Sequence, residues 1–202
     1  MKTYLEEYRL KISRLCMFLS LFVLCITENY WENNEKIITF ILFSIGIFLV
    51  AIASLGRMWC SLFIAGYKDN ELITQGPYSM CRNPLYFFSM IGALGVGFVT
   101  ETFIFPILIM ISFFLYYPSV IKDEENRLKE LFGESFENYK KKVPQLFPKF
   151  SNYKEPEEYL VKTKVYKRHM FSALWFVWIV GILELIEGLR ELRLLFSWCY
   201  IY

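Results

Sequence analysis

Apolar runs that alternate with polar segments are the dominant pattern in this chain. No charged residue occurs for 20 positions between Lys36 and Arg57, nor for 20 positions between Glu101 and Lys122. At about 1.5 Å of rise per residue, a helix over either run spans the ~30 Å hydrocarbon core of a bilayer. The pattern therefore predicts two membrane-spanning helices.

Three weaker apolar stretches extend this pattern. Residues 15–27 form a short run preceded by Lys11 and Arg14, whose long side chains can reach the bilayer surface, and residues 85–100 supply another uncharged run. The aromatic-rich stretch 170–183 continues into charged residues, so it is either a fifth span or a helix along the interface. We expect an all-α integral membrane helix bundle with about five transmembrane helices.

Composition agrees with a membrane location and excludes several other classes of protein. Of the 202 residues, 55% are hydrophobic and 19% are aromatic, an apolar share above that of ordinary soluble domains. A net charge of +2 argues against a disordered chain and against nucleic-acid binding. The 5 cysteines are single and lack the paired spacing of a zinc site or a disulfide scaffold, so we expect no metal site.

Basic residues are concentrated in alternate polar segments. With five spans, 19 of the 22 Lys and Arg residues fall in the N-terminal segment and in the polar segments 56–84 and 122–168. The positive-inside rule assigns all three segments to the cytoplasm, and four spans would move only the C-terminus. Because no internal repeat is evident, we expect one domain, 1–202, with a C-terminal helical segment 170–202.

The polar segment before residue 85 is rich in turn signals. Gly76-Pro77 marks a turn, and Pro84 suits the first position of a helix. An ordinary cytoplasmic loop with Arg82 at a helix start explains these features equally well. Cys81 beside Arg82 suggests a lowered thiol pKa, but no His or second Cys lies near it in the sequence, so we expect it to be a reduced packing residue like the other cysteines.

A second polar cluster directly follows the apolar run that ends before Lys122. Asp123, Glu124 and Glu125 stand where the excess of basic residues makes carboxylates unexpected. For Glu137, a solvated helix with a basic partner three or four positions further on is the preferred interpretation. For Glu124 and Glu125, the alternative is a pair of carboxylates that face Arg82 and bind a ligand with an amine or sulfonium cation.

Together, the two clusters resemble the isoprenylcysteine carboxyl methyltransferase family of integral membrane enzymes, and the phospholipid N-methyltransferases share much of this pattern. The resemblance covers residues 56–148 and is carried by ELITQGPY at 71–78, RNPLY at 82–86, Glu124-Glu125 and the segment 132–148. It implies S-adenosyl-L-methionine as the cofactor, bound at the cytoplasmic membrane surface. It also implies methyl transfer to a lipophilic or membrane-associated acceptor.

The resemblance assigns roles to individual residues. Glu124 receives the amino group of the cofactor, and Tyr78 and Tyr86 lie against its adenine or sulfonium. We further expect Arg82 to orient the acceptor or stabilise the site, and Glu125 to act as the neighbour that supports Glu124; both are assigned to catalysis. The expected cofactor-binding residues are Asn70, Glu71, Leu72, Ile73, Tyr78, Asn83, Pro84, Leu85, Tyr86 and Glu124.

Two departures from the family pattern affect the expected chemistry. The usual His between Arg and Pro is Asn83, which forms hydrogen bonds but carries no proton at neutral pH. Val120 stands where the farnesylcysteine enzymes have an Arg for the substrate. We therefore expect a lipid-like amphiphile other than a prenylcysteine carboxylate as acceptor. His169 is the only His, and we expect it to be an interfacial residue.

Two alternatives stay open. A membrane reductase that resembles the C-terminal region of the steroid reductases has a comparable Arg-x-Pro-x-Tyr and acidic-helix pattern, but it uses NADPH. The 2′-phosphate of NADPH favours several clustered basic residues, and the loop 70–86 holds only Arg82. A non-catalytic membrane scaffold would make the pairing of the two polar clusters a coincidence. The oligomeric state does not follow from the sequence.

Overall fold

The fold was analysed in a computed structural model, which describes residues 27–29, 35–67, 69–192, 194 and 199–201. Nearly all of the expected span 15–27 lies outside these residues. The elements in chain order are β1 (Thr27–Asn29), α3 (Lys36–Ile64), α4 (Pro77–Met80), α5 (Pro84–Val99), α6 (Ile104–Lys142), the 3-10 turn η1 (Phe150–Asn152), α7 (Thr163–Ala173), α8 (Trp175–Glu191) and β2 (Cys199–Ile201).

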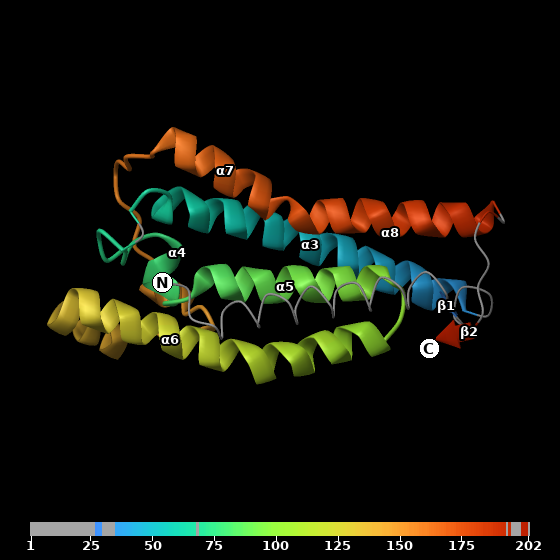
Figure 1. The fold of residues 1–202 in the computed structure, drawn as a ribbon, viewed down its shortest axis with the longest axis horizontal. Coiled ribbons are helices and arrows are strands. Elements are labelled where there is room, and N and C mark those ends of the chain that lie inside the picture. The colour runs from blue at the N-terminus through green and yellow to red at the C-terminus, as the bar shows by residue number, and fades with distance from the viewer. Residues whose placement is uncertain (1–26, 30–34, 68, 193, 195–198, 202) are drawn as a thin grey trace, which may run out of the picture.

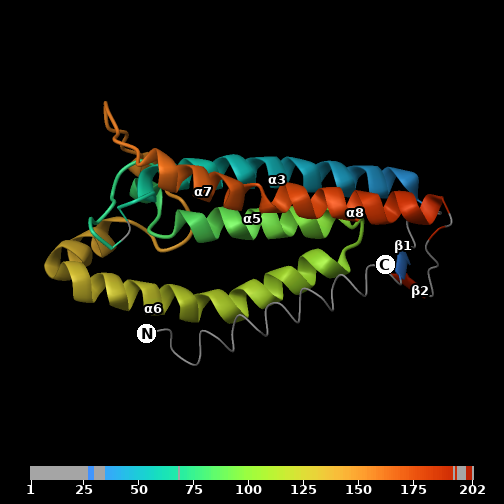
Figure 2. The ribbon, with the colours of Figure 1, turned by 45° about the horizontal axis from the view of Figure 1, so that its top comes forward.

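The long helices run lengthwise beside one another, as Figures 1 and 2 show. Helix α5 contacts α3, α6 and α8, so it lies at the centre of the arrangement, and α7 packs on α3. Val50 of α3, Val99 of α5, and Val180 and Leu183 of α8 form a buried apolar cluster between these helices. The predicted helix bundle is therefore confirmed.

Three helical segments are long and apolar enough to cross a membrane: Lys36–Ile64, Ile104–Lys142 and Thr163–Arg190. The shorter apolar helix Pro84–Val99 runs alongside them. The first two segments contain the two uncharged runs of 20 residues. The third joins α7 and α8, so the C-terminal apolar stretch has the length of a span, which the sequence alone left undecided.

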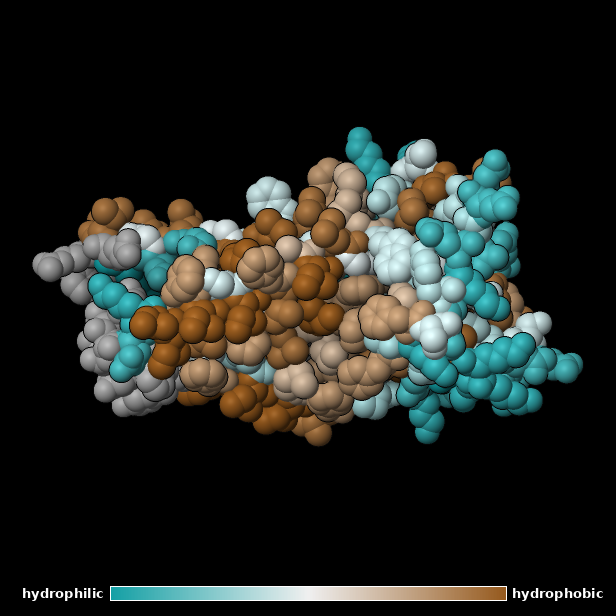
Figure 3. Space-filling model, turned by 180° about the vertical axis from the view of Figure 1, so that it is seen from behind, coloured by the Kyte–Doolittle hydropathy of each residue, from teal (hydrophilic) through white to brown (hydrophobic). Residues whose placement is uncertain are grey.

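Large apolar side chains cover the outside of these helices. Phe40 and Phe48 on α3 are each 71% exposed, and Leu115 on α6 is 79% exposed. Figure 3 shows a band of apolar residues across the middle of the face that it draws, with hydrophilic residues gathered toward the ends. Such a band is costly in water and suits the hydrocarbon core of a bilayer, which identifies an integral membrane protein.

The two large polar segments meet at one end of the bundle, hereafter the polar end, as Figure 1 shows for α4 and the end of α6. The short strands β1 and β2 lie at the opposite end. They pair in parallel with Thr27 opposite Cys199, a contact that the sequence did not predict. The chain near residue 199 is thus far from the polar end, as the five-span alternative requires.

Helix α6 is interrupted at Gly133, where φ is 51° and ψ is −121°. After this break the chain folds back, so Phe136 and Tyr139 pack near Leu128 in a buried cluster. Because of the turn, Glu137 pairs with Lys129 at 2.8 Å, eight positions earlier. This ion pair lowers the pKa of the Glu137 carboxyl, and Lys140 and Lys141, three and four positions further on as expected, lower it as well.

Candidate functional site

The segment between α3 and α5 is a turn-rich loop fixed at the polar end. Gly76 has a φ of 58°, and an added Cβ would lie 2.3 Å from the Phe63 ring, so only glycine fits here. The Gly76 N–H donates to the carbonyl oxygen of Lys154 at 2.7 Å, and the Lys154 N–H donates to Ser79 Oγ at 2.9 Å. The segment around Lys154, which follows η1, thereby holds α4 in place.

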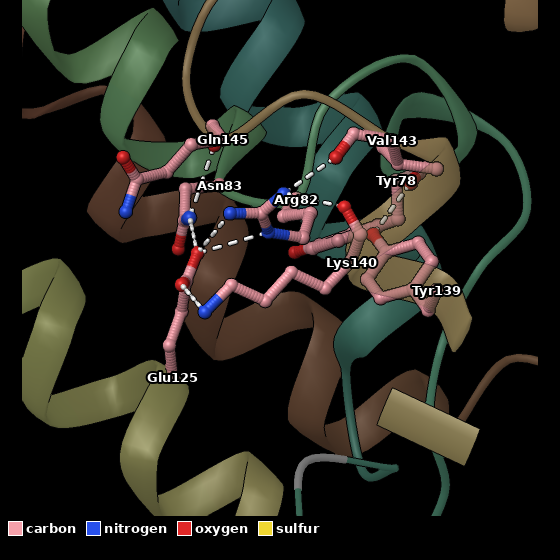
Figure 4. Close-up of polar contacts among 8 residues, drawn as sticks. All are labelled: Tyr78, Arg82, Asn83, Glu125, Tyr139, Lys140, Val143 and Gln145. Carbon is pink, nitrogen blue, oxygen red and sulfur yellow. Dashed lines mark hydrogen bonds and ion pairs between the residues drawn. The ribbon is translucent and has the colours of Figure 1, made fainter. Parts of the chain in front are cut away.

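A buried ion pair joins the start of α5 to α6 (Figure 4). Arg82 Nε donates to Glu125 Oε1 at 2.9 Å, Nη2 forms an ion pair with the same oxygen at 2.9 Å, and Glu125 is 7% exposed. Arg82 Nη1 donates to the carbonyl oxygens of Val143 at 2.5 Å and Lys140 at 3.2 Å. All three guanidinium nitrogens are therefore engaged by the protein itself.

Further hydrogen bonds hold the folded-back part of α6 against the loop. The Asn83 N–H and Asn83 Nδ2 donate to the carbonyl oxygen of Gln145 at 3.1 Å and 3.0 Å. The Tyr139 hydroxyl donates to the carbonyl oxygen of Tyr78 at 2.6 Å. The two polar clusters of the sequence consequently form one rigid unit, shown in Figure 4.

A pocket opens between the loop, the start of α5 and the middle of α6. It combines carboxylate, phenol and guanidinium groups with aliphatic side chains. Its walls are formed by Ile64, Asp69, Glu71, Leu72, Ile73, Tyr78, Arg82, Asn83, Pro84, Leu85, Tyr86, Glu124, Arg127, Leu128, Tyr139 and His169.

The acidic side of this pocket is organised around Glu124. The Tyr86 hydroxyl donates to Glu124 Oε2 at 2.7 Å, and Arg127 Nη2 lies 3.7 Å from Glu124 Oε1. Arg127 Nη1 in turn donates to Asp69 Oδ2 at 2.9 Å. The carboxylate of Glu124 is thus held in a fixed position on the pocket wall by two elements, α5 and α6.

The hydroxyl group of Tyr78 in the pocket wall is buried and has no hydrogen-bond partner among the described residues. Burial raises the pKa of Tyr78 well above its usual value, so its hydroxyl stays protonated and can donate. A buried phenol without a partner costs about 1–3 kcal/mol, which a polar ligand in the pocket would recover.

Most residues assigned to the cofactor from the sequence line this pocket, and their roles stay predictions. Asn70 is the exception and does not line the pocket. Its neighbour Asp69 lies in the pocket wall instead, where it accepts a hydrogen bond from Arg127. Glu125 also lies outside the pocket, since its carboxylate faces Arg82 and Lys140. Arg82 does line the pocket.

The sequence reasoning missed several wall residues. Arg127 lies one turn after Glu124 and was recognisable from helical spacing. Tyr139 enters the pocket through the break at Gly133. His169, expected only at the interface, reaches the wall because α7 packs on α3, a tertiary contact without a local sequence signal.

Cys81 is a packing residue, as expected, and the lowered pKa that its neighbour Arg82 suggested does not occur. Cys81 is fully buried, and burial raises the pKa of its thiol to about 12. The charge of Arg82 lowers this pKa by a smaller amount, because the guanidinium is already neutralised by Glu125. Cys81 is therefore a protonated packing residue at neutral pH.

Comparison with known proteins places this architecture in a family. The phospholipid methyltransferase family model matches residues 35–135, which include α3, α5 and most of the pocket wall. The chain belongs to the phospholipid methyltransferase family. Together with the similarity to an isoprenylcysteine O-methyltransferase, this match confirms the resemblance to the wider superfamily. Family membership supports methyltransferase activity.

The relatives within this superfamily carry two kinds of name. The chain is 32% identical to the nickel-cobalt-cadmium resistance protein NccN of Alcaligenes xylosoxydans xylosoxydans over 95% of this chain and 88% of that protein. It is 32% identical to the cobalt-zinc-cadmium resistance protein CzcN of Cupriavidus metallidurans over 90% of this chain and 82% of that protein.

A third relative is named for a methyltransferase activity. The chain is 36% identical to the protein-S-isoprenylcysteine O-methyltransferase of Schizosaccharomyces pombe over 40% of this chain and 34% of that protein. No solved structure matches the chain.

Proposed function

We propose that this protein transfers a methyl group from S-adenosyl-L-methionine to a lipophilic acceptor in the membrane. The observation that carries the proposal is the pocket at the polar end, where both polar clusters meet around Glu124. When bound, S-adenosyl-L-methionine supplies an electrophilic methyl group, whose bond to sulfur breaks with its electron pair going to sulfur as the acceptor attacks.

The wall residues match the groups that this cofactor presents. The Glu124 carboxylate complements an ammonium group, and the buried Tyr78 hydroxyl is a donor without a partner in the described residues. Leu72 and Ile73 supply an apolar surface for an aromatic base, and Tyr86 supplies a ring for a cation. Methyl transfer of this kind depends mainly on alignment, so a rigid wall is what the reaction needs.

We propose that Arg82 and Glu125 position this wall. All three guanidinium nitrogens of Arg82 contact Glu125 or backbone carbonyl groups, so its main interactions are with the protein itself. The pair instead fixes the start of α5, which carries Tyr86. This interpretation replaces direct contact of Arg82 with the acceptor.

The reductase alternative is less well supported by the pocket. Its two guanidinium groups, Arg82 and Arg127, are both paired with carboxylates of the protein. A dinucleotide with a 2′-phosphate would compete with Glu125, Asp69 and Glu124 for these cations.

The metal-resistance names of two relatives suggest a cellular setting for the same reaction. Among the described residues, no three His, Cys, Asp or Glu side chains gather as a metal site. The pocket carboxylates Asp69 and Glu124 are instead paired with Arg127. We propose that a role in metal resistance would act through methylation of a membrane component.

The cofactor is tested by calorimetric titration of the purified protein with S-adenosylhomocysteine and, separately, with NADPH. We expect S-adenosylhomocysteine to bind and NADPH not to bind. Glu124→Gln should weaken binding by about 1.5–3 kcal/mol, roughly 10- to 150-fold, because a charge-assisted hydrogen bond is lost. Glu130→Gln, an exposed residue of the same helix, is the control. Equal affinity of both variants would remove Glu124 from the site.

We further propose that the polar end faces the cytoplasm, because 19 of the 22 basic residues lie in segments assigned to that side. Single cysteines are introduced at the exposed residues Glu157, at the polar end, and Glu35, where α3 begins. In intact cells, a membrane-impermeant maleimide should label the cysteine at position 35 and reach position 157 only after permeabilisation. Labelling of position 157 alone would reverse the orientation.

A further inference from the structure

Arg57 is a charged residue inside the helix bundle, within the candidate membrane span of α3. Its Nη1 donates to Ser89 Oγ of α5, and its Nη2 donates to Ser172 Oγ of α7 at 3.3 Å. The guanidinium carbon also lies 5.6 Å from the centre of the Phe176 ring in α8. Arg57 therefore sits where four helices meet.

The partners of this cation among the described residues are all neutral. In the part of the chain that the structure describes, no carboxylate forms an ion pair with Arg57. Its Nε is buried and makes no hydrogen bond, and the buried Ser54 Oγ one turn away on α3 also has no partner there. A cation without an anionic partner and a hydroxyl without a hydrogen-bond partner both cost free energy in an apolar environment. Binding of an anionic ligand would recover part of that cost.

The position of Arg57 relates it to the candidate cofactor pocket. Ser89 lies one turn after Tyr86 on α5, and Ser172 lies one turn after His169 on α7. Tyr86 and His169 line the pocket, and both helices run from the polar end into the apolar band. Arg57 is therefore about one to two helical turns, roughly 5–10 Å, from the pocket wall, on its apolar side.

We propose that Arg57 binds the anionic group of a membrane amphiphile on the apolar side of the pocket, so that the acceptor atom is directed toward the methyl donor. This inference rests on the proposed methyl transfer. In this proposal, Arg57 of α3 supplies the cation that the sequence lacks at position 120, where Val120 stands. The class of expected acceptors then includes anionic amphiphiles. Arg57 is partly exposed, which leaves room for a ligand from the bilayer.

Two sources of the anion share this chemistry. A guanidinium binds the carboxylate of a prenylcysteine or the phosphate of a phospholipid in the same forked geometry. Both amphiphiles place the anion at the boundary between the apolar chain and water. The hydroxyl groups of Ser89 and Ser172 hold the guanidinium in place and take one N–H of each terminal nitrogen, which leaves the second N–H of Nη1 and of Nη2 for the ligand.

The test compares matched pairs of amphiphiles that differ in charge. N-acetyl-S-farnesylcysteine is compared with its methyl ester, and oleoyl lysophosphatidic acid with monoolein, for binding to the purified protein in neutral detergent. We expect the protein to bind the anionic member of at least one pair about tenfold more tightly or better. The pair that shows the preference identifies carboxylate or phosphate as the anion. Equal binding within both pairs would overturn the proposal.

Variants then test whether Arg57 causes the preference for the anionic amphiphile. Arg57→Gln should abolish it, Arg57→Lys should keep part of it, and both should bind S-adenosylhomocysteine like the unmodified protein. Arg168→Gln removes an exposed Arg from α7 and should keep the full preference. An unchanged preference in Arg57→Gln would also overturn the proposal. Since the amphiphile measurement needs no cofactor, failure of S-adenosylhomocysteine to bind would instead count against the proposed function.

Discussion

Arg82→Ala is expected to destabilise the protein by about 3–5 kcal/mol, because it leaves Glu125 as a buried charge without its main partner. The Arg82 and Glu125 side chains are only 9% and 8% exposed, and Lys140 at 3.7 Å is a poor substitute. The carbonyl groups of Val143 and Lys140 also lose their donor. Thermal unfolding followed by tryptophan fluorescence in detergent measures the loss.

The same substitution should abolish binding of S-adenosylhomocysteine, since the loop and the folded-back part of α6 are held together through Arg82. The double variant Arg82→Met/Glu125→Leu should be less destabilised than Arg82→Ala, because no buried charge is left. Lys129→Met breaks the exposed pair with Glu137 and serves as the control, with an expected cost below about 1 kcal/mol. A cost for Arg82→Ala as small as that of the control would show that the pair does not support the site.

The apolar helices and most of the pocket wall were predictable from the sequence. The uncharged runs specify helix positions because the bilayer admits few alternatives to a helix. The motif residues cluster because the loop 71–78 and the start of α5 are adjacent in the chain, and α6 returns to the same end after one helix hairpin. Local sequence and hairpin topology were sufficient for these contacts.

The remaining features depend on contacts between distant segments. The break at Gly133 brings Tyr139 to the pocket, whereas the apolar spacing around it also fits one continuous helix. His169 and the partners of Arg57 arise from the packing of α7 on α3, which no local pattern encodes. The directions of the two adjacent carboxylates also depend on tertiary contacts. Glu124 faces the pocket, whereas Glu125 lies outside it and faces Arg82 and Lys140.

The contact between α3 and α5 should be the part of the bundle least tolerant of substitution. Gly46 and Gly95 meet there with their backbones in contact: a Cβ on Gly95 would lie 2.8 Å from the Gly46 carbonyl oxygen, and one on Gly46 would lie 2.7 Å from the Gly95 carbonyl oxygen. Small residues let membrane helices approach closely in this way. Since backbone atoms cannot move aside as a side chain can, the helices themselves must separate.

Gly95→Val is therefore expected to lower stability by about 3 kcal/mol, at the upper end of the usual cost of overpacking. Separation of α5 from α3 would also displace Ser89 from Arg57, so the preference for anionic amphiphiles should weaken in the same variant. Gly181→Val is the matched control, because no atom lies within 4 Å of a Cβ at that position of α8. Thermal unfolding of both variants in detergent measures the difference, and equal melting temperatures would mean that the close approach of α3 and α5 does not limit stability.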